Sequence, residues 1–292
     1  MGEPSVPGRR VSVVIPCYNG GAHLAQALAS LKAQTYRDFE VVVVDDGSDD
    51  VETVRVLDGL GPEARLVRQE NRGLPAARNA GMAAAAGELV LPLDCDDELE
   101  PDFLQRTVAA LDAHPDAGFA FSHLRLTGER QGVLAKDYNF FTQLFLNQLP
   151  YCLLMRKGTW ERLGGYDETM LQGYEDWEYN IRAGANGLFG VCVPEALFRY
   201  RVSGAGMLKS ISNRLHAELW RDIQDRNPDL YRPPALIACW RRWRHRPMAY
   251  PAWMLAGLWT VHRLLPGFAF NRLYAVLMRY SASARTSASE GP

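Results

Sequence analysis

The sequence lacks the short motifs that identify several common nucleotide-dependent enzymes. The turn after the first apolar segment contains no G-x-G-x-x-G, and no G-x-x-x-x-G-K-[ST] occurs in the 292 residues. Both motifs bind phosphates, so their absence argues against a dinucleotide-dependent dehydrogenase and a P-loop ATPase. A formal net charge of −2 also provides no global basic excess for binding nucleic acid.

The chain has few cysteines, and its first ten residues have no apolar run. The five cysteines are scattered and form no C-x-x-C pair. This odd set disfavours a zinc site or a disulfide framework and favours a reducing compartment. We expect residues 1–10 to be a flexible tail rather than a signal peptide, and the protein to be cytoplasmic.

Apolar segments of strand length alternate with segments of helical periodicity. The predicted strands are 11–16, 40–44, 65–68 and 89–93, and the predicted helices are 23–34, 51–60 and 74–86. Further along, we expect a helix at 102–114, strands at 118–126 and 153–156, and two short strands at 187–193 and 197–202. The alternation predicts βαβ units and an α/β fold with a parallel sheet.

Polar residues follow three of these strands, at 16–19, 45–48 and 94–97. Ligands of parallel sheets bind outside the carboxyl ends of the strands, so we expect the three segments to face one crevice. Asp94 and Asp96 could share one divalent cation and leave its other positions to phosphate and water. A solvated acidic turn is the alternative.

Five motifs follow one another along the chain. They are Val13-Val14-Ile15-Pro16-x-Tyr18-Asn19, Val44-Asp45-Asp46-Gly47-Ser48-x-Asp50, Asn71-x-Gly73-x-x-x-Ala77-Arg78-Asn79-x-Gly81, Leu93-Asp94-x-Asp96-Asp97, and Gly164-Gly165-Tyr166-Asp167-Glu168 followed by Glu175-Asp176. Together, over roughly residues 11–203, they resemble the family 2 inverting glycosyltransferases of the GT-A fold.

This resemblance implies a Rossmann-like, mostly parallel sheet flanked by helices. Residues 11–98 would bind the nucleotide-sugar and residues 99–205 the acceptor. We expect a helical extension over 206–280 and a disordered tail over 281–292.

The resemblance also implies roles for particular residues at the donor site. Pro16 and Tyr18 would line the base pocket, and Asp46 would accept a hydrogen bond from the base. Asn71 and Arg78 would contact the nucleotide. Asp94 would contact ribose or metal, and Asp96 would hold Mn²⁺ or Mg²⁺.

A carboxylate must take the proton of the attacking sugar hydroxyl, and we assign Asp176 to this role. Its neighbour Glu175 is the alternative base. Both acids could instead only cap a helix, because acidic residues favour helix N-termini.

Two departures from the family pattern matter. Residues 199–204 lack the histidine that many members carry as a further metal ligand. Water or phosphate would then complete the coordination, the metal would bind weakly, or Arg201 would face the diphosphate. The Q-x-x-R-W motif of processive synthases is also absent, which favours transfer of one sugar per encounter.

We therefore expect an inverting transferase that moves a sugar from a nucleoside diphosphate to a hydroxyl of a glycan, glycolipid or other surface glycoconjugate. UDP is the default donor nucleotide, and dTDP and GDP stay open. The alternatives are an inactive relative that acts as a binding subunit and a sugar nucleotidyltransferase.

The C-terminal part is basic and aromatic. From Leu236 onward it has eight Arg and no Lys against one acid, Glu290, and Arg alternates with Trp near residue 242. The apolar segment 248–261 is too short to span a bilayer and suits an anionic membrane surface, which would be the inner face of the cell membrane. Packing on the catalytic core or pairing of two chains is the alternative, and nucleic-acid binding is the weakest one.

Overall fold

The computed structural model describes residues 11–204, 212, 214–248 and 250–286, with side chains as far as residue 276. Within these residues the centre is one nine-stranded sheet of order β3-β2-β1-β4-β8-β6-β9-β5, with β7 paired to β6. The strands are β1 Val11–Cys17, β2 Phe39–Asp46, β3 Ala64–Gln69, β4 Leu89–Pro92, β5 Glu98–Leu99, β6 Phe119–Gly128, β7 Gly132–Leu134, β8 Leu154–Arg156 and β9 Gly190–Val202.

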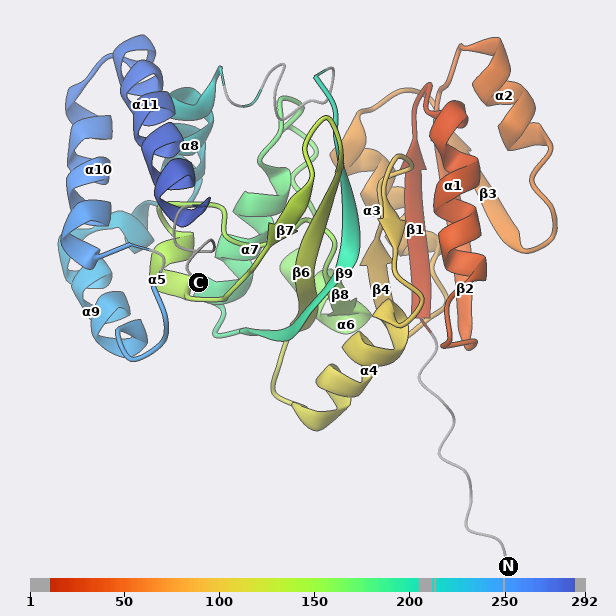
Figure 1. The fold of residues 1–292 in the computed structure, drawn as a ribbon, viewed down its shortest axis with the longest axis horizontal. Helices are drawn as coiled ribbons and strands as arrows, with labels where there is room; N and C mark the ends of the chain where they lie inside the picture. Colours follow the sequence, from red (N-terminus) through yellow and green to blue (C-terminus); the bar gives the residue numbers. More distant parts are fainter. Residues whose placement is uncertain (1–10, 205–211, 213, 249, 287–292) are drawn as a thin grey trace, which may run out of the picture.

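Helices surround this sheet, which confirms the predicted α/β class (Figure 1). They are α1 Gly21–Lys32, α2 Val51–Asp58, α3 Leu74–Ala84, α4 Phe103–Ala113, α5 Phe140–Gln143, α6 Lys157–Leu163, α7 Glu175–Ala185, α8 His216–Arg226, η2 Pro228–Tyr231 (a 3₁₀ helix), α9 Pro233–Trp243, α10 Ala252–Leu264 and α11 Gly267–Thr286.

The central strands read as continuous apolar runs because both faces of the sheet are covered. Successive side chains of a strand point to opposite faces. Val13 and Ile15 pack in a cluster with α1 and α4, whereas Val14 packs in a second cluster with α3 and α7. Each strand therefore connects two hydrophobic layers.

The strands that carry the predicted donor site are neighbours. β1 lies between β2 and β4 and is parallel to both, with Cys17 opposite Asp45 and Val14 opposite Pro92. The carboxyl ends of all three strands consequently lie at the same edge of the sheet. This confirms the common edge expected for segments 16–19, 45–48 and 94–97.

One strand prediction is wrong. Residues 187–193 and 197–202 were expected to form two short strands, but Gly190–Val202 is the single strand β9. It runs parallel to β6, with register irregularities between Ser122 and Leu124 that absorb the break in the apolar pattern. One sheet spans residues 11–98 and 99–205, so the structure does not separate them into two domains. Their division into a donor half and an acceptor half remains our proposal.

The C-terminal helices pack on the core, as one of the sequence alternatives proposed. Trp220 of α8 stacks on Trp177 of α7, with ring centroids 6.3 Å apart, and Trp243 of α9 packs edge-on against Tyr138. Figure 1 places α8–α11 at the end of the molecule opposite α1 and α2. None of the helices in the described part of the chain is long and apolar enough to cross a bilayer.

The predicted tails fall mostly outside the described part. Residues 1–10 and 287–292 are not described. Residues 281–286, which were expected to be disordered, belong to α11.

Candidate active site

Arg78 is the cation at the centre of the candidate site. It lies on α3, which begins after Gly73 in a backbone conformation with φ of 89° and carries a proline in its first turn. One guanidinium nitrogen donates to Glu175 Oε1 at 2.6 Å, and the other donates to Asp94 Oδ1 at 2.7 Å. Its side chain is only 2% exposed. Arg78 thus joins the tip of β4 to the N-terminus of α7.

Aromatic rings enclose the same guanidinium. Its carbon lies 4.8 Å from the centre of the Tyr151 ring and 5.7 Å from that of Tyr166. Such cation–π contacts are stronger when water is excluded. This enclosure fixes Arg78 in place. Its expected direct contact with the nucleotide stays a prediction.

Two adjacent acids begin α7, and both have raised pKa values. Burial raises the pKa of Glu175 to about 7, and Asp176 adds to the shift while Arg78 opposes it. Burial also raises the pKa of Asp176, against the opposing effect of Arg78. Glu175 and Asp176 therefore hold a proton more readily than they would in water, although Arg78 is near.

Hydrogen bonds orient the Asp176 carboxylate. Its Oδ1 accepts from the backbone N–H of Trp177 at 2.8 Å, and its Oδ2 accepts from Asn147 Nδ2 at 3.1 Å. Gln143 Nε2 in turn donates to Asn147 Oδ1 at 3.2 Å. Asp176 remains half-buried, so part of it is accessible to a ligand.

The acidic segment after β4 is held by a buried carboxylate. Asp97 accepts from the Tyr151 hydroxyl at 2.6 Å and from the backbone N–H of Arg201 at 2.7 Å. Burial raises the pKa of Asp97 well above its ordinary value, with Asp96 and Asp94 adding to the shift. Asp97 therefore ties the acidic segment to β9.

Arg201 lies beside the proposed metal ligand. Its Nε donates to the backbone carbonyl of Asp96 at 2.9 Å, and another guanidinium nitrogen donates to Gln26 at 2.6 Å. The expected contact of Arg201 with a diphosphate stays a prediction. Arg201 does lie at the carboxyl-end edge of the sheet, where ligands of parallel sheets bind.

The residues present fit a divalent cation that is bound together with a substrate. Burial and the charge of Asp94 raise the pKa of Asp96, so negative charge is concentrated at this loop without full compensation. Within the described residues no cluster of three or more His, Cys, Asp or Glu could hold a metal by itself. Mg²⁺ is commonly bound by one or two carboxylates, waters and substrate phosphates. Asp96 and Asp94 suit that arrangement.

Tyr200 of β9 relates the proposed metal ligands to the proposed base. Burial raises the pKa of its hydroxyl, and nearby negative charges raise it further. Those charges belong to Asp97, Asp94, Asp96 and Asp176. Asp96 and Asp176 therefore both act electrostatically on the same half-buried phenol.

On the donor side, Asp46 positions a loop. It is 3% exposed, and its two oxygens accept from the backbone N–H groups of Arg72 and Gly73, both at 2.9 Å. The neighbouring Gly47 has φ of 73°, and a side chain there would press on the backbone of Asn71. The loops after β2 and β3 thus touch each other. The predicted contact of Asp46 with a base stays a prediction.

The other predicted donor residues differ in exposure. Pro16 is buried within β1, Tyr18 is 50% exposed just beyond it, and Asn71 is exposed on its loop. A base at the strand tips would reach Tyr18 and Asn71 without moving the sheet. The roles of all three stay predictions.

Sequence reasoning gave no role to four residues that shape the site. Asn19 joins the tip of β1 to the loop before α2 through bonds to Asp49 and Asp50. Asn79 binds the backbone of Tyr166. Asn19, Asn79 and Asp97 lie inside the five motifs, and this position in the sequence could have indicated that they belong to the site. Asn147 lies outside every motif, and only the fold brings it to Asp176.

Comparison with known protein families gives the family. The profile described as Glycosyl transferase family 2 matches residues 12–157. The PGL/p-HBAD biosynthesis glycosyltransferase of Mycobacterium bovis is 32% identical over 183 residues, which are 60% of this chain and 70% of that protein. The uncharacterized glycosyltransferase YwdF of Bacillus subtilis is 28% identical over 206 residues, 68% of this chain and 76% of that protein. The chain belongs to glycosyl transferase family 2.

Solved structures support the fold. S. aureus TarS 1-349 in complex with UDP-GlcNAc superposes with a TM-score of 0.62 at 21% identity, over 73% of this chain and 65% of that chain. TarS in complex with UDP gives a TM-score of 0.55 at 23% identity, over 72% of this chain and 64% of that one. The predicted GT-A fold is confirmed. Some matches are local, and the one to the uncharacterized glycosyltransferase alr2836 of Nostoc spans only 34% of this chain and 32% of that protein.

Proposed function

We propose that this protein is an inverting glycosyltransferase that transfers one sugar from a nucleoside diphosphate to an acceptor hydroxyl. The observation that carries the proposal is the bridge formed by Arg78, which joins Asp94 at the donor edge to Glu175 beside Asp176. Family membership and a half-buried, oriented carboxylate next to this bridge support the same chemistry.

Asp176 acts as the general base in this proposal. The acceptor oxygen attacks the anomeric carbon while the bond from that carbon to the diphosphate breaks. The bond electrons leave with the diphosphate, and the hydroxyl proton moves to Asp176. A carboxylate with a raised pKa is better matched to this transfer than one in water. Asn147 and the N–H of Trp177 hold the carboxylate in place.

Glu175 serves the site through Arg78. It is 4% exposed and engages the guanidinium at 2.6 Å, so it is less accessible to an acceptor than the half-buried Asp176. The pair fixes the direction of the first turn of α7. Glu175 is therefore a positioning residue and Asp176 the base.

Asp96 and Asp94 would hold Mn²⁺ or Mg²⁺ together with the diphosphate. When bound, such a cation neutralises the charge that grows on the leaving group. Asp94 is 25% exposed, but its carboxylate also accepts two hydrogen bonds from Arg78. We therefore take Asp96 as the more available ligand.

UDP is the donor nucleotide we propose. The support is the structural neighbour TarS, which is solved with UDP and with UDP-GlcNAc. Tyr18 and Asn71 are exposed next to the strand tips and would contact the base. The proposed acceptor is a hydroxyl of a glycan or glycolipid, bound on the side of Asn147 and Asp176.

Turnover of nucleotide-sugars tests the proposed function. Purified protein is incubated with Mn²⁺ and a panel of UDP-, dTDP- and GDP-sugars, and released nucleoside diphosphate is measured. We expect release with at least one UDP-sugar, slow without acceptor and abolished by chelation. Asp229→Asn, which changes an exposed carboxylate on η2, is the matched control for Asp176→Asn and should retain activity. Nucleotide binding without any turnover would instead support an inactive binding subunit.

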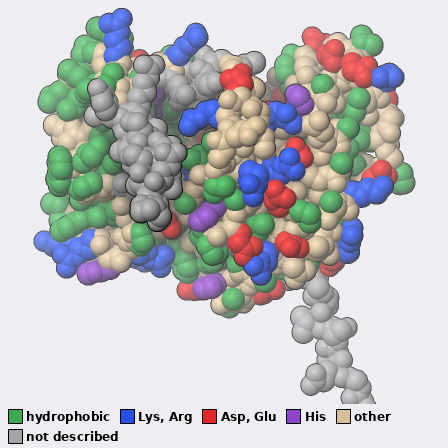
Figure 2. All heavy atoms as spheres, in the orientation of Figure 1, with side chains coloured by type: hydrophobic (Ala, Val, Ile, Leu, Met, Phe, Trp, Pro, Cys, Tyr) green, Lys and Arg blue, Asp and Glu red, His purple; other side chains and the backbone are tan. Residues whose placement is uncertain are grey.

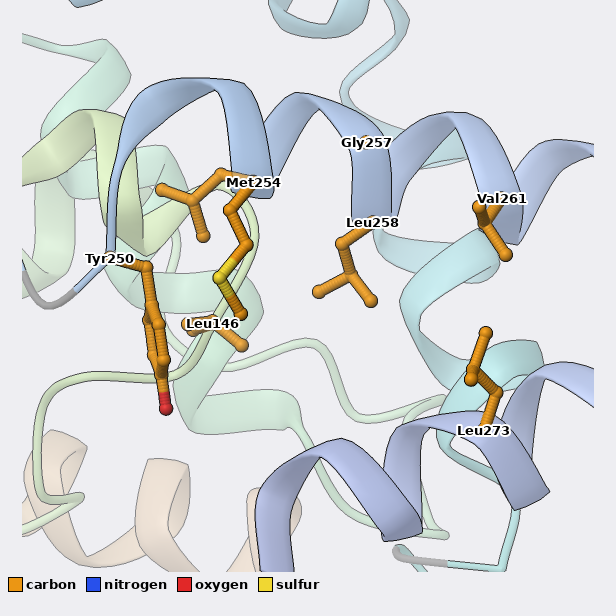
Figure 3. A pocket seen from close by; sticks show the side chains of 8 residues that line it. Leu146, Tyr250, Met254, Gly257, Leu258, Val261 and Leu273 are labelled. Atoms are coloured by element: carbon orange, nitrogen blue, oxygen red, sulfur yellow. The ribbon is translucent and has the colours of Figure 1, made fainter. Parts of the chain in front are cut away.

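We also propose that the C-terminal helices bind an anionic membrane surface. A cavity of about 210 Å³ lies between α10 and α11, and its lining is apolar (Figure 3). Trp253, Leu264 and Phe268 are 77%, 76% and 68% exposed on the same helices. Figure 2 shows hydrophobic side chains gathered over the end of the molecule formed by α9 and α10, with basic side chains at its lower end.

The charge around this apolar surface favours an anionic membrane over a second copy of the chain. Residues 236–276 contain six Arg and no Asp or Glu. Exposed arginines beside tryptophan favour the headgroup region of an anionic bilayer, whereas a second copy of this basic surface would be repelled.

Sedimentation with vesicles tests the membrane proposal. We expect binding to phosphatidylglycerol-containing vesicles, loss of binding with pure phosphatidylcholine, and weaker binding of Trp253→Ala. Leu171→Ala, which removes a 55% exposed leucine from the catalytic domain, should bind like the unaltered protein. A stable dimer in solution that does not sediment with either vesicle would contradict the proposal.

A further inference from the structure

Two cysteines meet at the tips of neighbouring strands in the candidate site. Cys17 ends β1, and Cys95 follows β4. The two strands are parallel, and the pairing continues past β4 because Leu93 N donates to the carbonyl of Val14 at 2.9 Å. Cys17 lies three residues beyond Val14, and Cys95 lies two residues beyond Leu93. The pair therefore arises from strands that are distant in sequence.

The two sulfur atoms lie near one backbone position, that of Gly20. A side chain at Gly20 would overlap Cys95 Sγ and would lie 3.6 Å from Cys17 Sγ. Both cysteines are free, and Gly20 leaves the room that the sulfur atoms occupy.

The difference in exposure between the two cysteines indicates which of them reacts first. Cys95 is half-buried, whereas Cys17 is 1% exposed, so Cys95 is the cysteine that a soluble oxidant would meet first. A disulfide needs its Cβ atoms about 3.5–4.5 Å apart, which adjacent positions at the ends of paired strands can provide. The other cysteines lie on different elements: Cys152 precedes β8, Cys192 is in β9 and Cys239 is in α9.

We propose that Cys17 and Cys95 are a reversible disulfide-forming site that switches off the enzyme under oxidising conditions. Cys95 stands between Asp94 and Asp96, and Cys17 directly precedes Tyr18. A bond between the sulfurs would fix the metal-binding segment to the base-binding segment. The effect on activity rests on the proposed function, whereas formation of the bond does not.

The chemistry needs a disulfide oxidant, for which glutathione disulfide is the probe. Cys95 loses its proton, and its sulfur attacks one sulfur of the oxidant, which forms a mixed disulfide and releases one glutathione. Cys17 then loses its proton, attacks the Cys95 sulfur and releases the second glutathione. The protein loses two hydrogens and two electrons, and the oxidant gains both.

A small displacement at this loop is enough to inhibit. Misplacing a reacting group by about 1 Å can cost on the order of 10²-fold in rate. The oxidised protein should therefore lose about 10²-fold of its UDP-sugar turnover and recover it with dithiothreitol. Binding of Mn²⁺ with UDP should weaken in parallel.

Peptide mapping tests the bond directly. After oxidation, trypsin should release peptides 11–32 and 79–106 joined to each other, since each contains one cysteine. Cys17→Ser and Cys95→Ser should each remain active in reducing buffer and lose the response to oxidant. Cys239→Ser, a half-buried cysteine of α9, is the matched control and should keep the response.

Two results would overturn the proposal. One is that peptides 11–32 and 79–106 stay separate while the protein remains folded at a glutathione disulfide concentration that oxidises a reference dithiol. The other is that the joined peptides form with no change in UDP–Mn²⁺ binding or turnover. Because mapping needs no transferase assay, failure of the proposed function is recognised separately from failure of the disulfide.

Discussion

Replacing Arg78 by methionine should destabilise the protein far more than replacing an exposed arginine with an equally short ion pair. Arg78 contacts Glu175 at 2.6 Å, and its side chain is 2% exposed. Arg72 contacts Glu168 at the same distance of 2.6 Å, but it is 61% exposed. Bond length is thus matched and burial differs. Removing one partner of a buried pair costs about 3–5 kcal/mol, whereas an exposed pair is worth about 0–1 kcal/mol.

Urea unfolding of Arg78→Met and Arg72→Met measures this difference. The cost at Arg78 comes from the buried Glu175 and the half-buried Asp94, which lose their cation, so Glu175→Gln added to Arg78→Met should restore part of the stability. If Arg78→Met cost no more than Arg72→Met, Arg78 would not hold the two sides of the site together. If the added Glu175→Gln destabilised further, unpaired charge would not be the cause.

Three further predictions concern the base, the pH dependence and the packing of α3. Asn147→Ala removes a hydrogen bond to the charged form of Asp176, so the rise of kcat with pH should move to higher pH, while Asn186→Ala should leave it in place. Burial raises the pKa of Glu175 from 4.5 to about 7, so the folded state binds more protons than the unfolded state in this window. Stability should fall as pH rises from about 4.5 to 7, by up to roughly 3 kcal/mol, and urea unfolding of Glu175→Gln should show a flatter profile. Gly81→Ala would overlap Val14 and should lower the free energy of unfolding by about 1–3 kcal/mol, whereas Gly158→Ala meets no atom within 4 Å and should be neutral or stabilising.

Local patterns predicted the N-terminal part of the fold, up to β4, well. Buried parallel strands are apolar throughout, and helices show their periodicity, so β1, β2 and β4 were recognisable from composition alone. Their common edge followed from the rule that parallel strands end together. The irregular strand β9 was not recognisable as one element, because its shift against β6 interrupts the apolar pattern.

The candidate site was predictable in its residue types and not in its connections. Asp94, Arg78 and Asp176 could be named from motifs, but the sequence does not tell that Arg78 is enclosed and bonded to two carboxylates. Asp46 illustrates the same limit, since its burial and its bonds to the loop after β3 depend on contacts 26 and 27 residues away. Tertiary burial decides which acids face a ligand and which ones position the backbone.

The C-terminal helices show how composition can support two answers. Arginine and tryptophan in alternation are compatible with a membrane surface and with core packing. In the structure Trp220 and Trp243 are buried against the catalytic domain, while Trp253 is exposed. Only the fold separates the tryptophans that stabilise the protein from those available to a partner.

The central claim is that Asp96 and Asp176 act on one donor–acceptor pair in different ways. Measuring UDP-sugar turnover against Mn²⁺ concentration for Asp96→Asn and Asp176→Asn tests it most directly. We predict that Asp96→Asn raises the Mn²⁺ concentration needed for turnover, whereas Asp176→Asn lowers kcat by about 10²–10⁴-fold and leaves UDP–Mn²⁺ binding unchanged. Full turnover by both variants at the same Mn²⁺ concentration as the unaltered protein would contradict the claim.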